Sequence, residues 1–83
     1  DKSQASTKEA IWLNEHAAEY GFILRFPQDK VEITGISYES WHFRYVGEEA
    51  AKFMKENNLC LEEFVELAKA QQEQEALKEA EME

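Results

Sequence analysis

Cysteine, proline and glycine are all scarce in this chain. Its 83 residues include one cysteine, one proline and three glycines, which excludes a collagen-like repeat and a disulfide-rich scaffold. The single Cys60 cannot form an internal disulfide. No apolar run approaches the roughly 18 residues of a membrane-spanning helix, and no signal peptide is recognisable. Because the chain begins with Asp1 rather than Met, we expect residues upstream of it, so a missing signal does not argue against export.

Positive charge is also scarce, and the excess of acid is unevenly placed. Residues 1–60 carry 10 acidic and 7 basic side chains, whereas residues 61–83 carry 8 acidic and 2 basic ones. The resulting net charge of −9 repels nucleic-acid backbones and anionic membranes. We therefore expect no nucleic-acid partner and no contact with a lipid bilayer from this segment. The 43% of hydrophobic residues nevertheless predicts a folded protein, and the length allows one small domain.

Local patterns predict an α+β fold with a small antiparallel sheet and flanking helices. The expected order is a helix over 6–20, a strand over 22–26, a loop or hairpin connection over 28–35, a strand over 40–46 and helices over 48–58 and 59–83. Ser6 and Glu9 have the spacing of a capping box at the start of the first helix, and Gly21 is expected to end it. Two strands alone make a marginal sheet, which indicates that other strands complete it.

The only pairing of acid and histidine in a strand is Glu39 with His42. A zinc hydrolase needs a neutral imidazole to hold the metal and a carboxylate to take a proton from water. In a regular strand, residues three apart face opposite ways, but at a loop-to-strand junction Glu39 can curl back towards a metal on His42. The spacing alone leaves open the commoner alternative, a surface glutamate and a strand histidine with satisfied hydrogen bonds.

Four other polar or reactive side chains have ordinary explanations. His16 lies in a helical row with two aromatic residues, which favours a structural role. Cys60 sits between two leucines beside acidic residues, which favours a small buried side chain over a nucleophile. Arg25 and Arg44 lie in apolar strands and need partners. We expect internal ion pairs, with recognition of a substrate carboxylate as the alternative.

Five short runs follow one another in a definite order along the chain. They are WL at 12–13, YGFILRFP at 20–27, ITG at 33–35, ESWHFRYVG at 39–47 and LCLEEF at 59–64. Together they resemble the C-terminal half of the catalytic domain in VanY-type D-alanyl-D-alanine carboxypeptidases. These bacterial cell-wall enzymes are a zinc family that includes L,D-carboxypeptidases of the same fold. The resemblance covers roughly residues 11–67.

The resemblance implies a role for each residue that matches the family motif. His42 is implied as a zinc ligand, Glu39 as the general base, and Trp41 as a wall of the substrate pocket. Arg44 and Tyr45 are implied as packing and supporting residues. The implied reaction is zinc-dependent hydrolysis that releases the terminal D-alanine from a peptidoglycan stem peptide, outside the cytoplasm at the cell wall or cell surface.

The sequence departs from the family pattern in two places. Ser40 stands where the family usually has proline, and no stretch matches the upstream motif S-x-H-x-x-G-x-A-x-D that carries the other two zinc ligands. We do not assign Asp1 to that role. We therefore expect residues 1–70 to form the C-terminal part of a carboxypeptidase domain that needs the missing N-terminal half as a partner. Residues 71–83 are expected to be an acidic helical tail. The alternative function is that of a catalytically incomplete half-domain acting only as a binding fragment.

Overall fold

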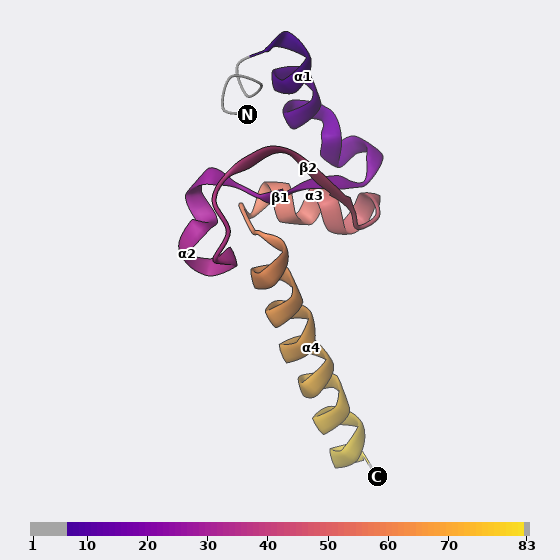
Figure 1. Ribbon diagram of the computed structural model, residues 1–83. Helices are drawn as coiled ribbons and strands as arrows, with labels where there is room; N and C mark the ends of the chain where they lie inside the picture. The colour runs from indigo at the N-terminus through magenta and orange to yellow at the C-terminus, as the bar shows by residue number, and fades with distance from the viewer. Residues whose placement is uncertain (1–6, 83) are drawn as a thin grey trace.

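The computed structural model describes residues 7–82 and contains two strands and four α-helices. The elements follow in the order α1 (Lys8–His16), β1 (Phe22–Phe26), α2 (Val31–Thr34), β2 (Glu39–Tyr45), α3 (Glu48–Glu56) and α4 (Leu61–Met82). The two strands form one antiparallel sheet, and helices flank it (Figure 1). The α+β class and the small antiparallel sheet are thus confirmed.

Helix α1 is capped one residue later than expected. Thr7 is the N-cap, and its side-chain oxygen accepts a hydrogen bond from the Ala10 amide at 3.1 Å. The prediction of Ser6 as the capping residue was therefore wrong, and Ser6 itself lies outside the described residues. The last turn tightens into a 3-10 turn over Ala17–Tyr20. Gly21 then ends the helical segment at φ +88°, as predicted, in a left-handed conformation that favours glycine.

The connection between the strands is helical rather than a loop or hairpin. Pro27 precedes a 3-10 turn over Gln28–Lys30, and α2 follows directly. The Gly35 amide closes α2 by donating to the Val31 carbonyl at 2.9 Å. Lys30 also forms an ion pair with Glu63 of α4 at 3.0 Å, so a contact distant in sequence holds this segment. The expectation of an irregular connection was wrong for that reason.

The sheet contains a bulge on β2. Phe22 pairs with Tyr45 and Leu24 with Phe43, but Phe26 pairs with Glu39. One residue separates Leu24 from Phe26 on β1, whereas three residues separate Glu39 from Phe43 on the opposite strand. The two extra residues bend β2 near its start and interrupt its alternation.

The core lies between the sheet and α3. Its buried residues are Ala18, Ile23, Ala51 and Met54. Helix α3 places Ala51 and Met54 in this core, and Lys55 of α3 donates to the Glu15 carbonyl at the end of α1. The helices after Gly47 therefore do not pack alike, because α3 covers the sheet while α4 leaves it after its first turns.

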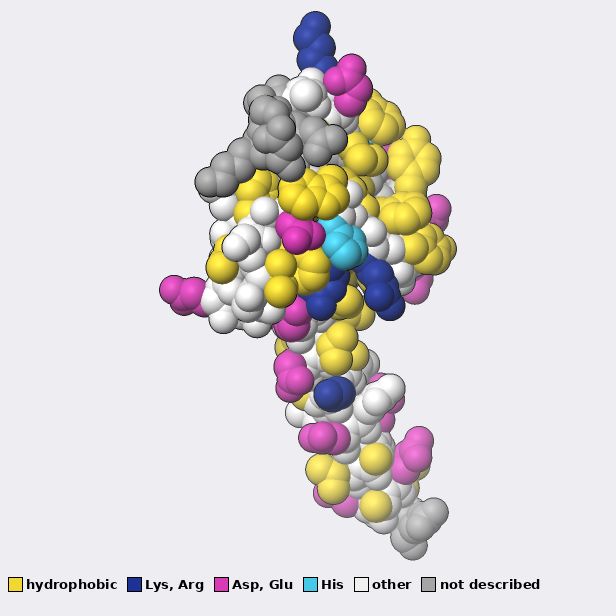
Figure 2. Space-filling model, in the orientation of Figure 1, with side chains coloured by type: hydrophobic (Ala, Val, Ile, Leu, Met, Phe, Trp, Pro, Cys, Tyr) yellow, Lys and Arg dark blue, Asp and Glu magenta, His cyan; other side chains and the backbone are white. Residues whose placement is uncertain are grey.

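Helix α4 projects from the rest of the molecule (Figure 1). The resulting shape measures 57 × 26 × 16 Å. Acidic side chains are spaced along this helix, while hydrophobic side chains gather over the globular part (Figure 2). Among the described residues, no helix combines the length and the apolar character that crossing a membrane requires.

Candidate functional site

The bulge of β2 brings Glu39 and His42 together. Glu39 Oε1 lies 3.4 Å from His42 Nδ1, although regular alternation would place residues three apart on opposite faces of a strand. The two extra residues in the register remove that alternation between positions 39 and 43. Both side chains reach solvent, with 49% of the His42 side chain and 28% of the Glu39 side chain exposed. A carboxylate and an imidazole therefore converge at an accessible point on the sheet.

An aromatic ring supports His42 from β1. The Phe26 and His42 ring centroids are 5.1 Å apart with an interplanar angle of 84°, the edge-to-face arrangement that aromatic pairs prefer. The Arg25 guanidinium lies over the same Phe26 ring, 4.6 Å from its centroid. Phe26 thus contacts a cation and the histidine, and it is also the register partner of Glu39.

Arg25 forms the internal ion pair that the sequence predicted. Its Nη1 donates to Glu62 Oε1 at 2.9 Å, which joins β1 to the first turn of α4. Burial acts to raise the pKa of Glu62, but the hydrogen bond from Arg25 and nearby backbone donors outweigh it and lower that pKa overall. Glu62 is therefore held as a carboxylate.

Sequence reasoning missed both Glu62 and Phe26 as members of this group. The available signal was the pair of glutamates in the first turn of the last helix. That pair is equally typical of a helix start that is stabilised by the macrodipole.

The two residues between Glu39 and His42 differ in their environment. Trp41 is 53% exposed, so its indole is available as a wall beside the pair. The Ser40 hydroxyl is buried, and among the described residues it has no hydrogen-bond partner. An environment without polar partners would suit the proline that the family resemblance implies at this position.

The other candidate residues lie in structural settings. His16 stacks on Trp12 with centroids 4.6 Å apart, and its Nδ1 lies 3.2 Å from Glu19 Oε2. Cys60 is 1% exposed, and burial raises the pKa of its thiol, which disfavours the nucleophilic thiolate. The predicted structural roles of His16 and Cys60 agree with these contacts. Within residues 7–82, the Arg44 guanidinium has no ion-pair partner, so the internal pair expected for Arg44 stays a prediction.

No set of three or more histidine, cysteine or acidic side chains converges on a possible metal site within residues 7–82. Zinc in a catalytic site normally has three protein ligands and an open position. Glu39 and His42 therefore fit part of such a site and not the whole of it. The described residues therefore do not by themselves complete a three-ligand zinc site.

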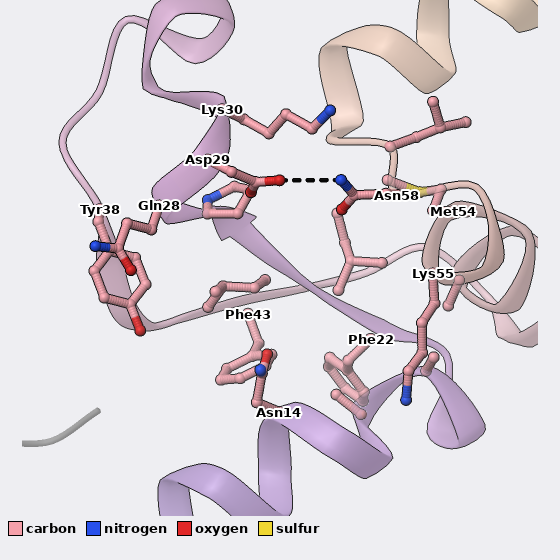
Figure 3. Close-up of a pocket in the computed structure, with 17 residues that line it drawn as sticks. Asn14, Phe22, Gln28, Asp29, Lys30, Tyr38, Phe43, Met54, Lys55 and Asn58 are labelled. Carbon is pink, nitrogen blue, oxygen red and sulfur yellow. Dashed lines mark hydrogen bonds between the residues drawn. The ribbon is translucent and has the colours of Figure 1, made fainter. Parts of the chain in front are cut away.

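A separate hollow of about 370 Å³ lies beside β1. Asn14 and Phe22 approach it from one side and Asn58 from the other, and a 3.0 Å hydrogen bond from Asn58 to Asp29 spans its border (Figure 3). Neither Glu39 nor His42 lines this hollow. This hollow is thus distinct from the carboxylate–imidazole pair.

Known proteins resemble this chain in sequence and in structure. The family model of the VanY D-alanyl-D-alanine carboxypeptidases matches residues 1–48. A D-alanyl-D-alanine carboxypeptidase of Enterococcus faecium is 54% identical over 61 residues, which cover 74% of this chain and 20% of that protein. The putative carboxypeptidase YodJ of Bacillus subtilis (strain 168) is 48% identical over 64 residues, covering 77% of this chain and 23% of that protein.

Two solved structures of related peptidases also superpose on this chain. The LD-carboxypeptidase LdcB, whose structure concerns peptidoglycan recognition, superposes with a TM-score of 0.76 and 45% identity, covering 80% of this chain and 31% of that one. A mutant of the vancomycin-resistance D,D-pentapeptidase VanY, in complex with Zn(II), superposes with a TM-score of 0.66 and 54% identity over 68% of this chain and 32% of that one. The chain therefore spans about a fifth to a third of the proteins that it matches.

Proposed function

Because this chain belongs to the VanY family of D-alanyl-D-alanine carboxypeptidases, we propose that it supplies the general base and one ligand of a zinc carboxypeptidase site. The substrate would be a peptidoglycan stem peptide, which loses its terminal D-alanine by hydrolysis. The observation that carries the proposal is the 3.4 Å approach of Glu39 Oε1 to His42 Nδ1 across the β2 bulge. Relatives bound to D-alanyl-D-alanine and to Zn(II) support the choice of substrate and metal.

Each residue has a defined part in this proposal. His42 would hold the metal through a ring nitrogen, and zinc when bound polarises the scissile carbonyl and makes water more acidic. Glu39 would take a proton from the attacking water as its oxygen bonds to the carbonyl carbon. It would then deliver that proton to the amine of D-alanine as the carbon–nitrogen bond breaks. The exposed Trp41 would form a wall of the substrate pocket.

The remaining parts of the site would come from the missing N-terminal half of the domain. The described residues contain no complete metal site, and the matched relatives are three to five times longer than the aligned segment. We therefore expect the 83-residue chain alone to be inactive. With such a substrate, the complete enzyme would act outside the cytoplasm, at the cell wall or cell surface.

The test uses a protein that contains this segment within a complete domain. Purified enzyme with zinc is incubated with synthetic stem pentapeptide and tetrapeptide, and the products are identified by mass spectrometry. We expect loss of one alanine, and the peptide that is cleaved decides between D,D and L,D specificity. Glu39→Gln should lower kcat by about 10²- to 10⁴-fold, the usual contribution of a general base, while the zinc content stays unchanged.

Two further variants make the result specific. His42→Ala should lose both zinc and activity. Glu66→Gln changes an exposed glutamate of α4 whose ion pair with Lys69 is long, at 3.8 Å, and should leave both unchanged. If Glu39→Gln retains full activity, the proposed general base is wrong. If the 83-residue chain alone proves to bind a cell-wall peptide without cleaving it or taking up zinc, the alternative role as a binding fragment gains support.

A further inference from the structure

A continuous series of contacts connects α4 to His42. Glu62 Oε1 accepts from Arg25 Nη1 at 2.9 Å, the Arg25 guanidinium lies 4.6 Å from the Phe26 ring centroid, and Phe26 meets His42 edge to face at 5.1 Å. These contacts join three elements, α4, β1 and β2. None of the contacts requires a metal or a substrate.

The two ends of this series differ in exposure. The Arg25 and Glu62 side chains are 21% and 32% exposed, so the ion pair is largely covered. The His42 side chain is 49% exposed, and its described side-chain contacts are the Glu39 carboxylate and the Phe26 ring. Because half of the imidazole faces solvent, few protein atoms restrain the ring. Its orientation therefore depends on the Glu39 carboxylate and the Phe26 ring.

Phe26 in turn depends on Arg25. A guanidinium over an aromatic face is attracted to the ring and restricts its rotation. Glu62 fixes the guanidinium by a charge-assisted hydrogen bond. The Phe26 ring, which contacts His42, is therefore held in place by the Arg25–Glu62 ion pair. Glu62 lies on α4, which begins after a 15-residue interval from the end of β2.

We propose that Arg25 is a positioning residue for His42, acting through Phe26, and that Glu62 of α4 anchors it. The catalytic meaning of this arrangement rests on the proposed function, but the contacts themselves do not. Outer residues that orient a metal-binding histidine typically change metal affinity by about 10- to 100-fold. Residue 62 lies beyond residue 48, where the family match ends, so α4 would be part of the support of the site.

The first test measures the His42 ring in the 83-residue chain without metal. Nuclear Overhauser contacts between the Phe26 and His42 ring protons are expected in the unmodified protein. Arg25→Met should abolish or strongly weaken them, whereas Arg25→Lys, which keeps a cation near the ring, should restore part of their intensity. If the Arg25→Met protein does not fold, the milder Glu62→Gln change replaces it. This change removes the charge that holds Arg25 and should also weaken the Phe26–His42 ring contacts.

Glu63→Gln is the matched control. Glu63 is the next residue of α4, and it accepts from the Cys60 amide and pairs with Lys30, both at 3.0 Å. Its loss should weaken the start and docking of α4 without touching Arg25 or Phe26. We expect lower stability but unchanged Phe26–His42 contacts, so a general loosening of α4 is distinguished from positioning of the histidine.

The second test measures metal affinity in a protein that contains the complete domain. Zinc dissociation constants are obtained by competition with a chelator. Arg25→Met and Glu62→Gln should weaken zinc binding about 10- to 100-fold, while Glu63→Gln should leave it within about twofold. Positioning is overturned if Arg25→Met leaves the Phe26–His42 contacts intact, or if Glu63→Gln disturbs them as much. If the unmodified complete domain binds no zinc, the proposed function fails, while the ring contacts still decide the inference.

Discussion

Replacing Gly21 by alanine should destabilise the protein more than the same change at Gly35. Both glycines end helical segments with positive φ, +88° and +74°, and an alanine in this region costs about 1–2 kcal/mol. A Cβ at Gly21 would also lie 2.7 Å from Tyr45 Cε1 and 3.1 Å from the Glu48 nitrogen, whereas a Cβ at Gly35 meets nothing within 4 Å. Overpacking typically adds about 1–3 kcal/mol.

The expected loss in free energy of unfolding is therefore about 2–5 kcal/mol for Gly21→Ala and about 1–2 kcal/mol for Gly35→Ala. The extra loss at Gly21 would also affect the sheet. The Gly21 carbonyl accepts hydrogen bonds from the Val46 and Gly47 amides, at 2.8 and 3.1 Å, where β2 ends. A shift at Gly21 therefore loosens the end of β2.

Equilibrium unfolding in urea, followed by circular dichroism, measures both losses on the same chain. A Tyr45→Ala background removes the 2.7 Å side-chain obstacle but leaves the backbone contacts. In that background, the loss in free energy of unfolding caused by Gly21→Ala should still exceed the loss caused by Gly35→Ala, but by a smaller amount. If Gly21→Ala is no more destabilising than Gly35→Ala, the close approach of β2 to Gly21 is wrong.

Three further results are expected from the packing and charges described above. Met54→Ala should cost about 2–5 kcal/mol in urea unfolding because Met54 is buried in the core, while Met82→Ala, at an 87% exposed position, should change stability by less than about 0.5 kcal/mol. The Cys60 amide and then Lys30 lower the pKa of Glu63. Its stabilisation is therefore present above the unfolded pKa of about 4.3 and is lost as pH falls through the lower folded value. Glu63→Gln should thus flatten the acid dependence of stability, and an unchanged slope would contradict that linkage. Deleting residues 71–83 should reduce helical ellipticity but leave the thermal midpoint of the globular part unchanged, and a lower midpoint would contradict the division of the chain at that position.

Much of the fold follows from short-range patterns in the sequence. The run FILRF before Pro27 predicted β1, and glycine at 21 predicted the end of the first helical segment. The connecting segment was harder, because α2 has only four residues and is shorter than any window in which helical periodicity shows. The Lys30–Glu63 ion pair that holds it joins residues 33 positions apart. The cap at Thr7 rather than Ser6 reflects two adjacent hydroxyl residues, either of which can cap a helix.

The approach of Glu39 to His42 could be anticipated from the sequence only in part, and the roles of the two residues remain predictions. Regular strand alternation places Glu39 and His42 on opposite faces, and the sequence could offer a loop-to-strand junction only as one way for them to meet. Their approach depends on the change of register between the Leu24–Phe43 pair and the Phe26–Glu39 pair. Such a change is a property of the two paired strands, so the sequence of one strand does not reveal it. The support from Arg25 and Glu62 is a contact over 37 positions, and no local pattern specifies such a partner.

The projecting helix α4 also determines how the molecule behaves in solution. A compact chain of 83 residues has a radius of gyration of about 12 Å, whereas this structure has 15.7 Å. Because that radius grows with about the 0.38 power of length, 15.7 Å is typical of a compact chain roughly twice as long. A single copy should therefore elute from a sizing column near the position of a globular dimer. Light scattering, which reports mass rather than radius, should still give the 9.7 kDa of one chain.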